Sequence, residues 1–324
     1  MRSRHLLPAL LGALLALAPV RSAHPQDWPQ RPVRIIVPFA PGGVTDAAAH
    51  FVAQPLGEAF GQPFVIEHRP GATGAIAAEA VARAPPDGYT LFLAGLSQIG
   101  IMPAAIKTSF DPLRDVVPIS AIATNPLVLA VHPRLPVASV ADFVAHARTR
   151  EGRLNYAALG VGSITHLAMA LFARQARIEM TPVMYKGGAA AVTDLIAGHV
   201  DAYFAAAFAV VPYAGGDLLR LLAVSSAQRI RQLPGVPTMI EAGYPGFKVL
   251  NWTGLMAPVG TPKPIIDRIA REVSRAAKDP KATAPLIASG FDPWGSTPEE
   301  FAATIAADIP FWAEAVRIAG VQEK

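Results

Sequence analysis

The chain has 324 residues, of which 52% are hydrophobic and 16% charged, and its formal net charge is +4. This length and apolar content suit two folded domains of ordinary size and exclude a chain that is disordered throughout. Because the chain has no cysteine, disulfides, thiol chemistry and a lipoprotein anchor on an N-terminal cysteine are excluded.

The first 23 residues have the layout of a secretory signal peptide. Arg2 and Arg4 precede an apolar run over 6–20, which is short for a membrane span. Small residues follow, so we expect cleavage near Ser22-Ala23 and export to the periplasm. The leader carries three arginines, and subtracting them from +4 leaves a net charge of +1. This near-neutral charge argues against nucleic-acid binding.

A strand, a glycine-rich turn and a helix are predicted next. Val33–Val37 is an apolar, β-branched run, and the Pro-Gly-Gly turn at 41–43 ends it. A helix to Phe60 follows, capped by Thr45 or Asp46. The glycines let the backbone approach a ligand, and the unpaired N–H groups of a helix's first turn favour an anion. An ordinary strand-to-helix connection is the alternative.

The rest of the chain alternates strands and helices, which indicates mostly parallel sheets with right-handed crossovers. Strands are predicted at Phe64–Glu67, Tyr89–Leu93, Val116–Thr124, Leu127–His132, Leu154–Ala157, Pro182–Tyr185, His199–Phe204, Leu218–Val224 and Lys248–Ala257. Helices are predicted at Gly71–Ala84, from Ser139 to Arg150, from Gly160–Ser163 through Ala176, from Gly187-Gly188 to Ala197, from Pro264, and from the capping box Thr297-Pro298-Glu299-Glu300 toward Ile318. Asn125-Pro126 is expected to separate two strands, and Ser97 and Gln98 to lie in a loop.

Three turns share one design, in which a strand leads through glycines into a helix. They are the turns at 41–43, Gly160–Ser163 and Lys186–Gly188. Ligands of open α/β sheets bind beyond the carboxyl ends of the strands, so the three turns are expected to line one cleft. Three unrelated helix starts are the alternative.

Short motifs occur in a fixed order along the chain after the leader. They include Arg34-Ile35-Ile36-Val37-Pro38-Phe39, Arg69-Pro70-Gly71-Ala72, Pro85-Pro86-Asp87-Gly88-Tyr89, Tyr185-Lys186-Gly187, Val236-Pro237-Thr238 and Glu241-Ala242-Gly243. With these motifs the chain resembles the Bug family of periplasmic solute-binding proteins, the receptors of tripartite tricarboxylate transporters. The resemblance implies a type II periplasmic-binding-protein fold, in which two α/β lobes with mostly parallel sheets close around a ligand like a Venus flytrap.

The resemblance also implies lobe boundaries and a ligand site. We place the two crossings near Asn125 and Asn251, so that lobe one comprises 24–124 and 251–324 and lobe two 125–250. Such receptors grip a carboxylate without metal or cofactor. The expected contacts are Phe39, Ala40, Pro41, Gly42, Gly43, Ser97, Gln98, Ser163, Thr165, His166, Gly187, Gly188 and Ala205.

Two positions depart from the family pattern. Ala205-Ala206-Ala207 stands where members commonly carry Asp-Asn, and Ile99 and Met102 stand where His and Asn are common. An unmatched buried ammonium or hydroxyl would cost about 1–3 kcal/mol. We therefore hypothesise a carboxylate ligand with an apolar or aromatic body. The alternative is that these substitutions only change the direction in which neighbouring polar groups point.

The favoured function is that of a monomeric binding protein that passes a small organic acid to membrane permease subunits after a hinge motion of its lobes. The alternatives are a ligand-sensing receptor for a sensor kinase and an exported enzyme on the same scaffold. The sequence offers no convincing nucleophile and base, and His50, His68, His132 and His199 lack metal-ligand spacing. We therefore expect no catalysis, metal or cofactor.

Overall fold

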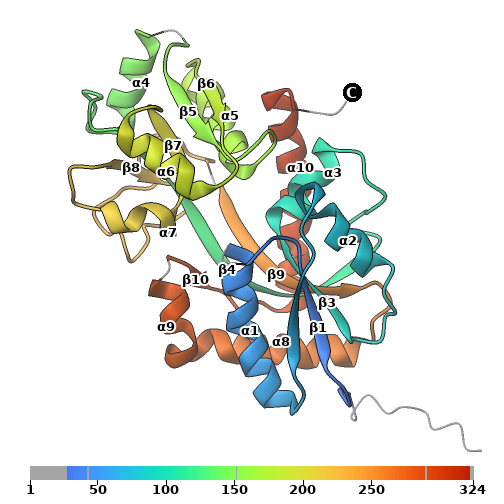
Figure 1. Cartoon of the computed structure of the whole chain (residues 1–324). Helices are drawn as coiled ribbons and strands as arrows, with labels where there is room; N and C mark the ends of the chain where they lie inside the picture. Colours follow the sequence, from blue (N-terminus) through green and yellow to red (C-terminus); the bar gives the residue numbers. More distant parts are fainter. Residues whose placement is uncertain (1–27, 42–43, 151, 248, 289, 322–324) are drawn as a thin grey trace, which may run out of the picture.

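The computed structural model describes residues 28–41, 44–150, 152–247, 249–288 and 290–321, so the predicted leader lies outside the described residues. Two groups of strands and helices are joined by the long strands β4 (Val116–Val131) and β9 (Leu250–Pro258), which lie side by side (Figure 1). Within the described ranges, no helix combines the length and hydropathy needed to cross a membrane.

The first lobe is built on β1 (Val33–Val37), β2 (Phe64–His68) and β3 (Thr90–Gly95). These three strands are parallel, whereas β9 runs antiparallel to β3 and to β4. The two-residue strand β10 (Asp292–Pro293) adds an antiparallel pair to β4.

Helices cover both faces of this sheet. Alternate side chains of β1 and β3, such as Ile35 and Leu93, pack against α1 (Val44–Phe60) and α8 (Lys263–Lys278). Phe92 packs on the other face, with α2 (Ala75–Ala82), α3 (Met102–Ala105) and α10 (Pro298–Ala319). Helix α9 (Pro280–Ala288) lies beside α1 and α8.

The second lobe has parallel strands β5 (Asn155–Ala158), β6 (Thr181–Met184) and β7 (Ala202–Ala206), in the order β6-β5-β7. Strand β4 pairs antiparallel with β7 and with β8 (Arg220–Val224). The flanking helices are α4 (Val140–Arg148), α5 (Ile164–Ala176), α6 (Gly188–Ala197) and the short α7 (Ala207–Val210). The predicted two-lobed α/β fold is confirmed, with parallel pairing within each lobe and antiparallel pairing along the crossing strands.

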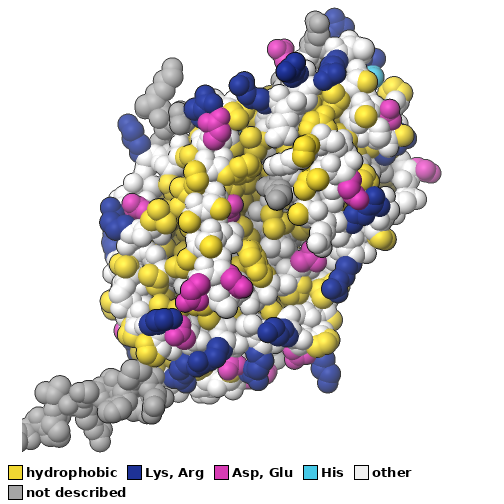
Figure 2. Space-filling view, turned by 180° about the vertical axis from the view of Figure 1, so that it is seen from behind, with side chains coloured by type: hydrophobic (Ala, Val, Ile, Leu, Met, Phe, Trp, Pro, Cys, Tyr) yellow, Lys and Arg dark blue, Asp and Glu magenta, His cyan; other side chains and the backbone are white. Residues whose placement is uncertain are grey.

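Helix α10 bridges the two lobes. It begins at the predicted capping box, where Thr297 Oγ1 accepts from the Glu300 N–H at 3.1 Å and the Glu300 carboxylate accepts from the Thr297 N–H at 2.9 Å. Phe301 packs edge-on against Trp252 of β9, and the later turns of α10 contact α5. One apolar cluster therefore runs from the first lobe into the second. On the face seen in Figure 2, Lys and Arg side chains lie mainly toward the outline, whereas several Asp and Glu side chains lie within the face.

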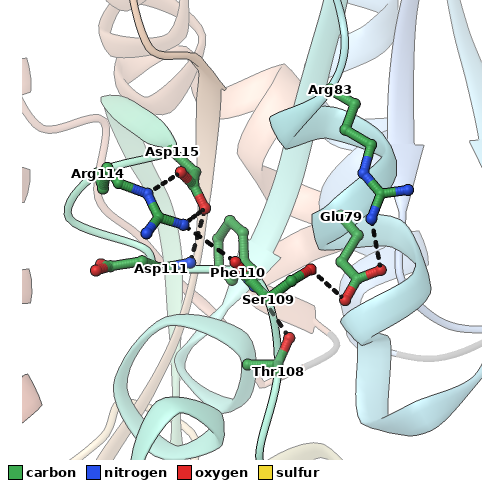
Figure 3. Close-up of polar contacts among 8 residues, drawn as sticks. All are labelled: Glu79, Arg83, Thr108, Ser109, Phe110, Asp111, Arg114 and Asp115. Atoms are coloured by element: carbon green, nitrogen blue, oxygen red, sulfur yellow. Dashed lines mark hydrogen bonds and ion pairs between the residues drawn. The ribbon is translucent and has the colours of Figure 1, made fainter.

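The loop before β4 is tied to α2 by polar contacts (Figure 3). Ser109 Oγ donates to the Glu79 carboxylate at 2.8 Å, and Arg83 pairs with the same carboxylate. Arg114 pairs with Asp115 at 2.6 Å. These contacts hold the chain in place where it enters the first crossing strand.

Three local predictions are wrong. Strand β4 continues through Asn125 and Pro126, because Pro126 lies between the residues that pair with β10 and those that pair with β7. Ser97 and Gln98 begin a helical turn, Ser97–Ile101, and do not lie in a loop. Helix α1 already starts at Val44, so Thr45 and Asp46 lie in its first turn and not at the position that precedes the helix.

Candidate ligand-binding site

The carboxyl ends of the parallel strands in both lobes lie next to the crossing. In the first lobe, Gly95 at the end of β3 pairs with Thr253 of β9. In the second, Ala206 at the end of β7 pairs with Leu127 of β4. Asn125 and Asn251 face each other in the ladder between these points. The turns that leave both sheets therefore open toward the same region between the lobes.

A cavity of about 210 Å³ lies at this edge of the first lobe. It is lined by Phe39, Thr45, Gly95, Ser97, Gln98, Asn251 and Thr253. Three of the predicted site residues, Phe39, Ser97 and Gln98, are thus brought together.

The Gln98 amide is already used inside the lobe. Its Oε1 accepts from the Gly95 N–H at 3.0 Å, and its Nε2 donates to the Thr73 carbonyl at 2.8 Å. The side chain is fully buried. Gln98 therefore shapes the wall of the cavity more than it offers spare hydrogen bonds.

The turn after β1 is described only in part. Ala40 and Pro41 are exposed, while the predicted ligand contacts at Gly42 and Gly43 lie outside the described residues. Asp46, just inside α1, contacts His68 Nε2 at 2.8 Å and so ties the start of this helix to the end of β2.

In the second lobe, polar groups surround the start of α5. Glycine is required at 160 and 162 because φ is +100° and +75° there. The Ser163 hydroxyl accepts from the His166 N–H and contacts Thr165 Oγ1 at 3.1 Å. Ser163, Thr165 and His166, which the family resemblance named as expected contacts, therefore lie together at the start of α5.

His166 presents a neutral imidazole. Its Nδ1 accepts from the Gly162 N–H at 3.2 Å, so the ring proton is on Nε2. Burial lowers the pKa of His166, and the ring stacks on Tyr156 with centroids 6.2 Å apart. The ring is thus a candidate hydrogen-bond donor without a full charge.

The remaining predicted residues lie near α6. Gly187 and Gly188, partly exposed, form the start of this helix, and no side chain caps it. Ala205 is fully buried on β7, so its methyl group packs in the core below the cleft edge.

Sequence reasoning missed Asn251 and Thr253 on β9. The signal was present, because both are polar residues in an otherwise apolar strand. The Thr253 hydroxyl and the Asn125 Oδ1 are buried without a hydrogen-bond partner among the described residues.

A larger hollow of about 610 Å³ between α1 and α9 contains none of the predicted site residues. Over the described ranges, no group of three or more His, Asp or Glu side chains could hold a metal ion.

The family model for the tripartite tricarboxylate transporter family receptor matches residues 48–319. The chain belongs to this family. The receptor is 36% identical over 325 aligned residues to Protein BugT of Bordetella pertussis, and the alignment covers 98% of each chain. The resemblance seen in the sequence motifs is confirmed.

Two solved structures are similar to this receptor over nearly their full length. R. palustris Rpa4515 with adipate is 36% identical, with a TM-score of 0.80 over 90% of this chain and 98% of that chain. MatC from Rhodopseudomonas palustris with bound malate is 32% identical, with a TM-score of 0.76 over 89% of this chain and 100% of that chain. As a member of this family, the tripartite tricarboxylate transporter receptor is a solute-binding protein and not an enzyme.

Proposed function

We propose that this receptor captures a small organic carboxylate between its lobes and delivers it to the membrane permease subunits of a tripartite tricarboxylate-type transporter. The observation that supports the proposal is that the carboxyl ends of the parallel strands of both lobes reach the crossing, beside a cavity of about 210 Å³ lined with small polar groups. Adipate and malate, held by two related proteins, are ligands of this chemical class.

Backbone N–H groups and one neutral side-chain donor are proposed to bind the carboxylate of the ligand. The first turns of α1 and α5 provide N–H groups and the positive ends of helix dipoles, which favour a carboxylate. His166 Nε2 adds a neutral donor on the second lobe. A ligand held by both lobes stabilises the closed arrangement, because it gains contacts there that neither lobe offers alone.

The body of the ligand is proposed to be apolar. Ile99 and Met102 are 0% and 2% exposed, so they cannot contact a ligand directly in this arrangement. Phe39 and Val161, on the turns of opposite lobes, are 37% and 68% exposed and offer apolar surface instead. Such surface suits aliphatic or aromatic acids better than densely polar ones.

The proposal extends to the organisation of the whole chain. We propose lobes of 24–124 with 251–324 and of 125–250, meeting at Asn125 and Asn251. The leader 1–23 is removed near Ser22-Ala23, and the mature protein works in the periplasm as a monomer.

A thermal-shift panel tests the ligand class. Wild-type protein is heated with adipate, hexanoate, benzoate, glutamate or citrate, after native mass spectrometry has identified any co-purified acid. Saturation at 100 times Kd is expected to stabilise the folded state by about 2.7 kcal/mol. Aliphatic or aromatic acids are expected to give the large shifts. Large shifts from glutamate and citrate alone would contradict the apolar body.

The turn at 42 is tested by mutation. Gly42→Val is expected to abolish binding and leave the unfolding midpoint without ligand unchanged, because a β-branched side chain would block the approach of a carboxylate to the turn. Gly235→Val is the control, since a Cβ there meets nothing within 4 Å. An unchanged Kd in Gly42→Val would place the anion elsewhere.

Co-purification with permease subunits separates transport from signalling through a sensor kinase.

A further inference from the structure

The start of α6 is an open helix terminus with a hydroxyl beside it. The helix spans ten residues, and its N-cap Gly187 supplies no side-chain hydrogen bond. Its first-turn N–H groups are therefore left without a side-chain acceptor. The helix follows β6, whereas α5 follows β5, so the two helix starts are separate positions along the same edge of the sheet.

Tyr203 of β7 lies directly below this terminus. A Cβ placed on Gly188 would stand 3.8 Å from the Tyr203 hydroxyl oxygen. Tyr203 is 1% exposed, and its hydroxyl has no hydrogen-bond partner in the described part of the chain. Among the described residues, the side-chain N and O atoms that are both sealed from solvent and without a hydrogen-bond partner belong to Trp28, Asn125 and Thr253, and not to Tyr203. The small exposed area of Tyr203 is therefore at its hydroxyl group.

The surroundings leave this hydroxyl as a free donor. Burial raises the pKa of Tyr203, so the phenol keeps its proton at neutral pH. The neighbouring Tyr185 differs, because its hydroxyl donates to Asp194 Oδ2 at 2.7 Å. Ala205 is two residues further along β7 on the same face, and its methyl group offers no hydrogen bond to the Tyr203 hydroxyl.

We propose that the Tyr203 hydroxyl and the first-turn N–H groups of α6 bind a second acidic group of the ligand. Tyr203 is then a specificity-determining residue that favours dicarboxylates over monocarboxylates of the same length. One carboxylate is held at the start of α5, and the other reaches the start of α6. This inference rests on the proposed function, since it concerns the same cleft.

Calorimetric titration with adipate and hexanoate tests the inference, because these acids have six carbons each and differ in the second carboxylate. Tyr203→Phe removes only the hydroxyl. Loss of a hydrogen bond to a charged group is expected to weaken adipate binding about ten- to a hundredfold. Hexanoate binding is expected to change less than about twofold. Tyr244→Phe is the matched control, since Tyr244 packs on Phe172 in the other apolar cluster.

Each other outcome overturns the inference. An unchanged adipate Kd in Tyr203→Phe would mean that the hydroxyl does not reach the ligand. Equal weakening of both acids would mean a structural role only. Wild-type protein that binds hexanoate but not adipate would disprove a dicarboxylate seat and leave the proposed function intact. If wild-type protein binds neither acid, the dicarboxylate seat fails, while the proposed function is judged by the wider thermal-shift panel.

Discussion

Gly254 on β9 shows how closely one residue is constrained by its neighbours. A Cβ there would lie 2.2 Å from Cζ and 2.4 Å from Cε1 of Phe301. Gly254→Ala is therefore expected to displace Phe301 from Trp252 and to lower the free energy of unfolding by about 1–3 kcal/mol. Urea unfolding measures the change. Gly57→Ala is the control, because a Cβ at this position of α1 would make an ordinary 3.6 Å contact with the Gln62 carbonyl oxygen. Equal stability of Gly254→Ala and wild type would contradict the packing.

The residues of the candidate site were easier to predict than the groups to which they are hydrogen-bonded. Ser163, Thr165 and His166 were named from the family resemblance, and they lie together because all three belong to one helix start. The partners of Gln98 could not be read from the sequence, since the Thr73 carbonyl comes from a turn 25 residues earlier. The Tyr203 hydroxyl was missed for a similar reason, as its neighbour at the start of α6 depends on how helix and sheet pack.

At the scale of elements, β9 and α10 are linked by a partly buried hydrogen bond. Trp252 Nε1 donates to Asp308 Oδ2 at 2.6 Å. Burial raises the pKa of Asp308, and the bond from Trp252 only partly opposes this. The folded state thus binds a proton more tightly than the unfolded chain, whose carboxyl titrates near about 3.9. Between the unfolded pKa and the raised folded pKa, stability falls as pH rises.

Asp308→Asn is expected to remove this part of the pH dependence. The amide oxygen can still accept from Trp252, but it does not titrate. Urea unfolding measured at several pH values above the unfolded pKa should give a flatter profile for Asp308→Asn than for wild type. Asp217→Asn, at an exposed carboxyl, is the control and should leave the profile unchanged. Parallel profiles for Asp308→Asn and wild type would show that Asp308 does not titrate differently on folding.

Elements defined by local contacts were predicted well. The capping box at Thr297 was correct, because its hydrogen bonds join residues three apart. The break at Asn125-Pro126 was wrong, because the continuity of β4 depends on β9, β7 and β8, which come much later in the chain. The antiparallel crossing strands were not foreseen for the same reason, since direction follows from tertiary pairing.

At the scale of the whole molecule, the apolar cluster shared by both lobes makes unfolding cooperative. We expect a single urea transition that coincides when followed by tryptophan fluorescence and by far-ultraviolet circular dichroism. The fluorescence reports Trp28, Trp252, Trp294 and Trp312, whereas the circular dichroism reports the helices of both lobes. Two separated transitions would mean that the lobes are independent folding units.

The two-lobed arrangement was predictable only in outline. Alternating strands and helices indicated α/β layers, and the family motifs indicated two lobes. The bridging of the lobes by α10 was not predicted, because its later turns look like an ordinary amphipathic helix in the sequence. The lobe boundaries stay a prediction, although Asn125 and Asn251 are direct partners in the β4–β9 ladder.

The bridge formed by α10 makes the two flanks of the molecule unequal. Helix α10 contacts α5 in the second lobe and α3 and the turn Ser97–Ile101 in the first, so it joins the two lobes along one side. We therefore expect the two lobes to separate most on the side away from α10, and we propose that the ligand enters and leaves on that side.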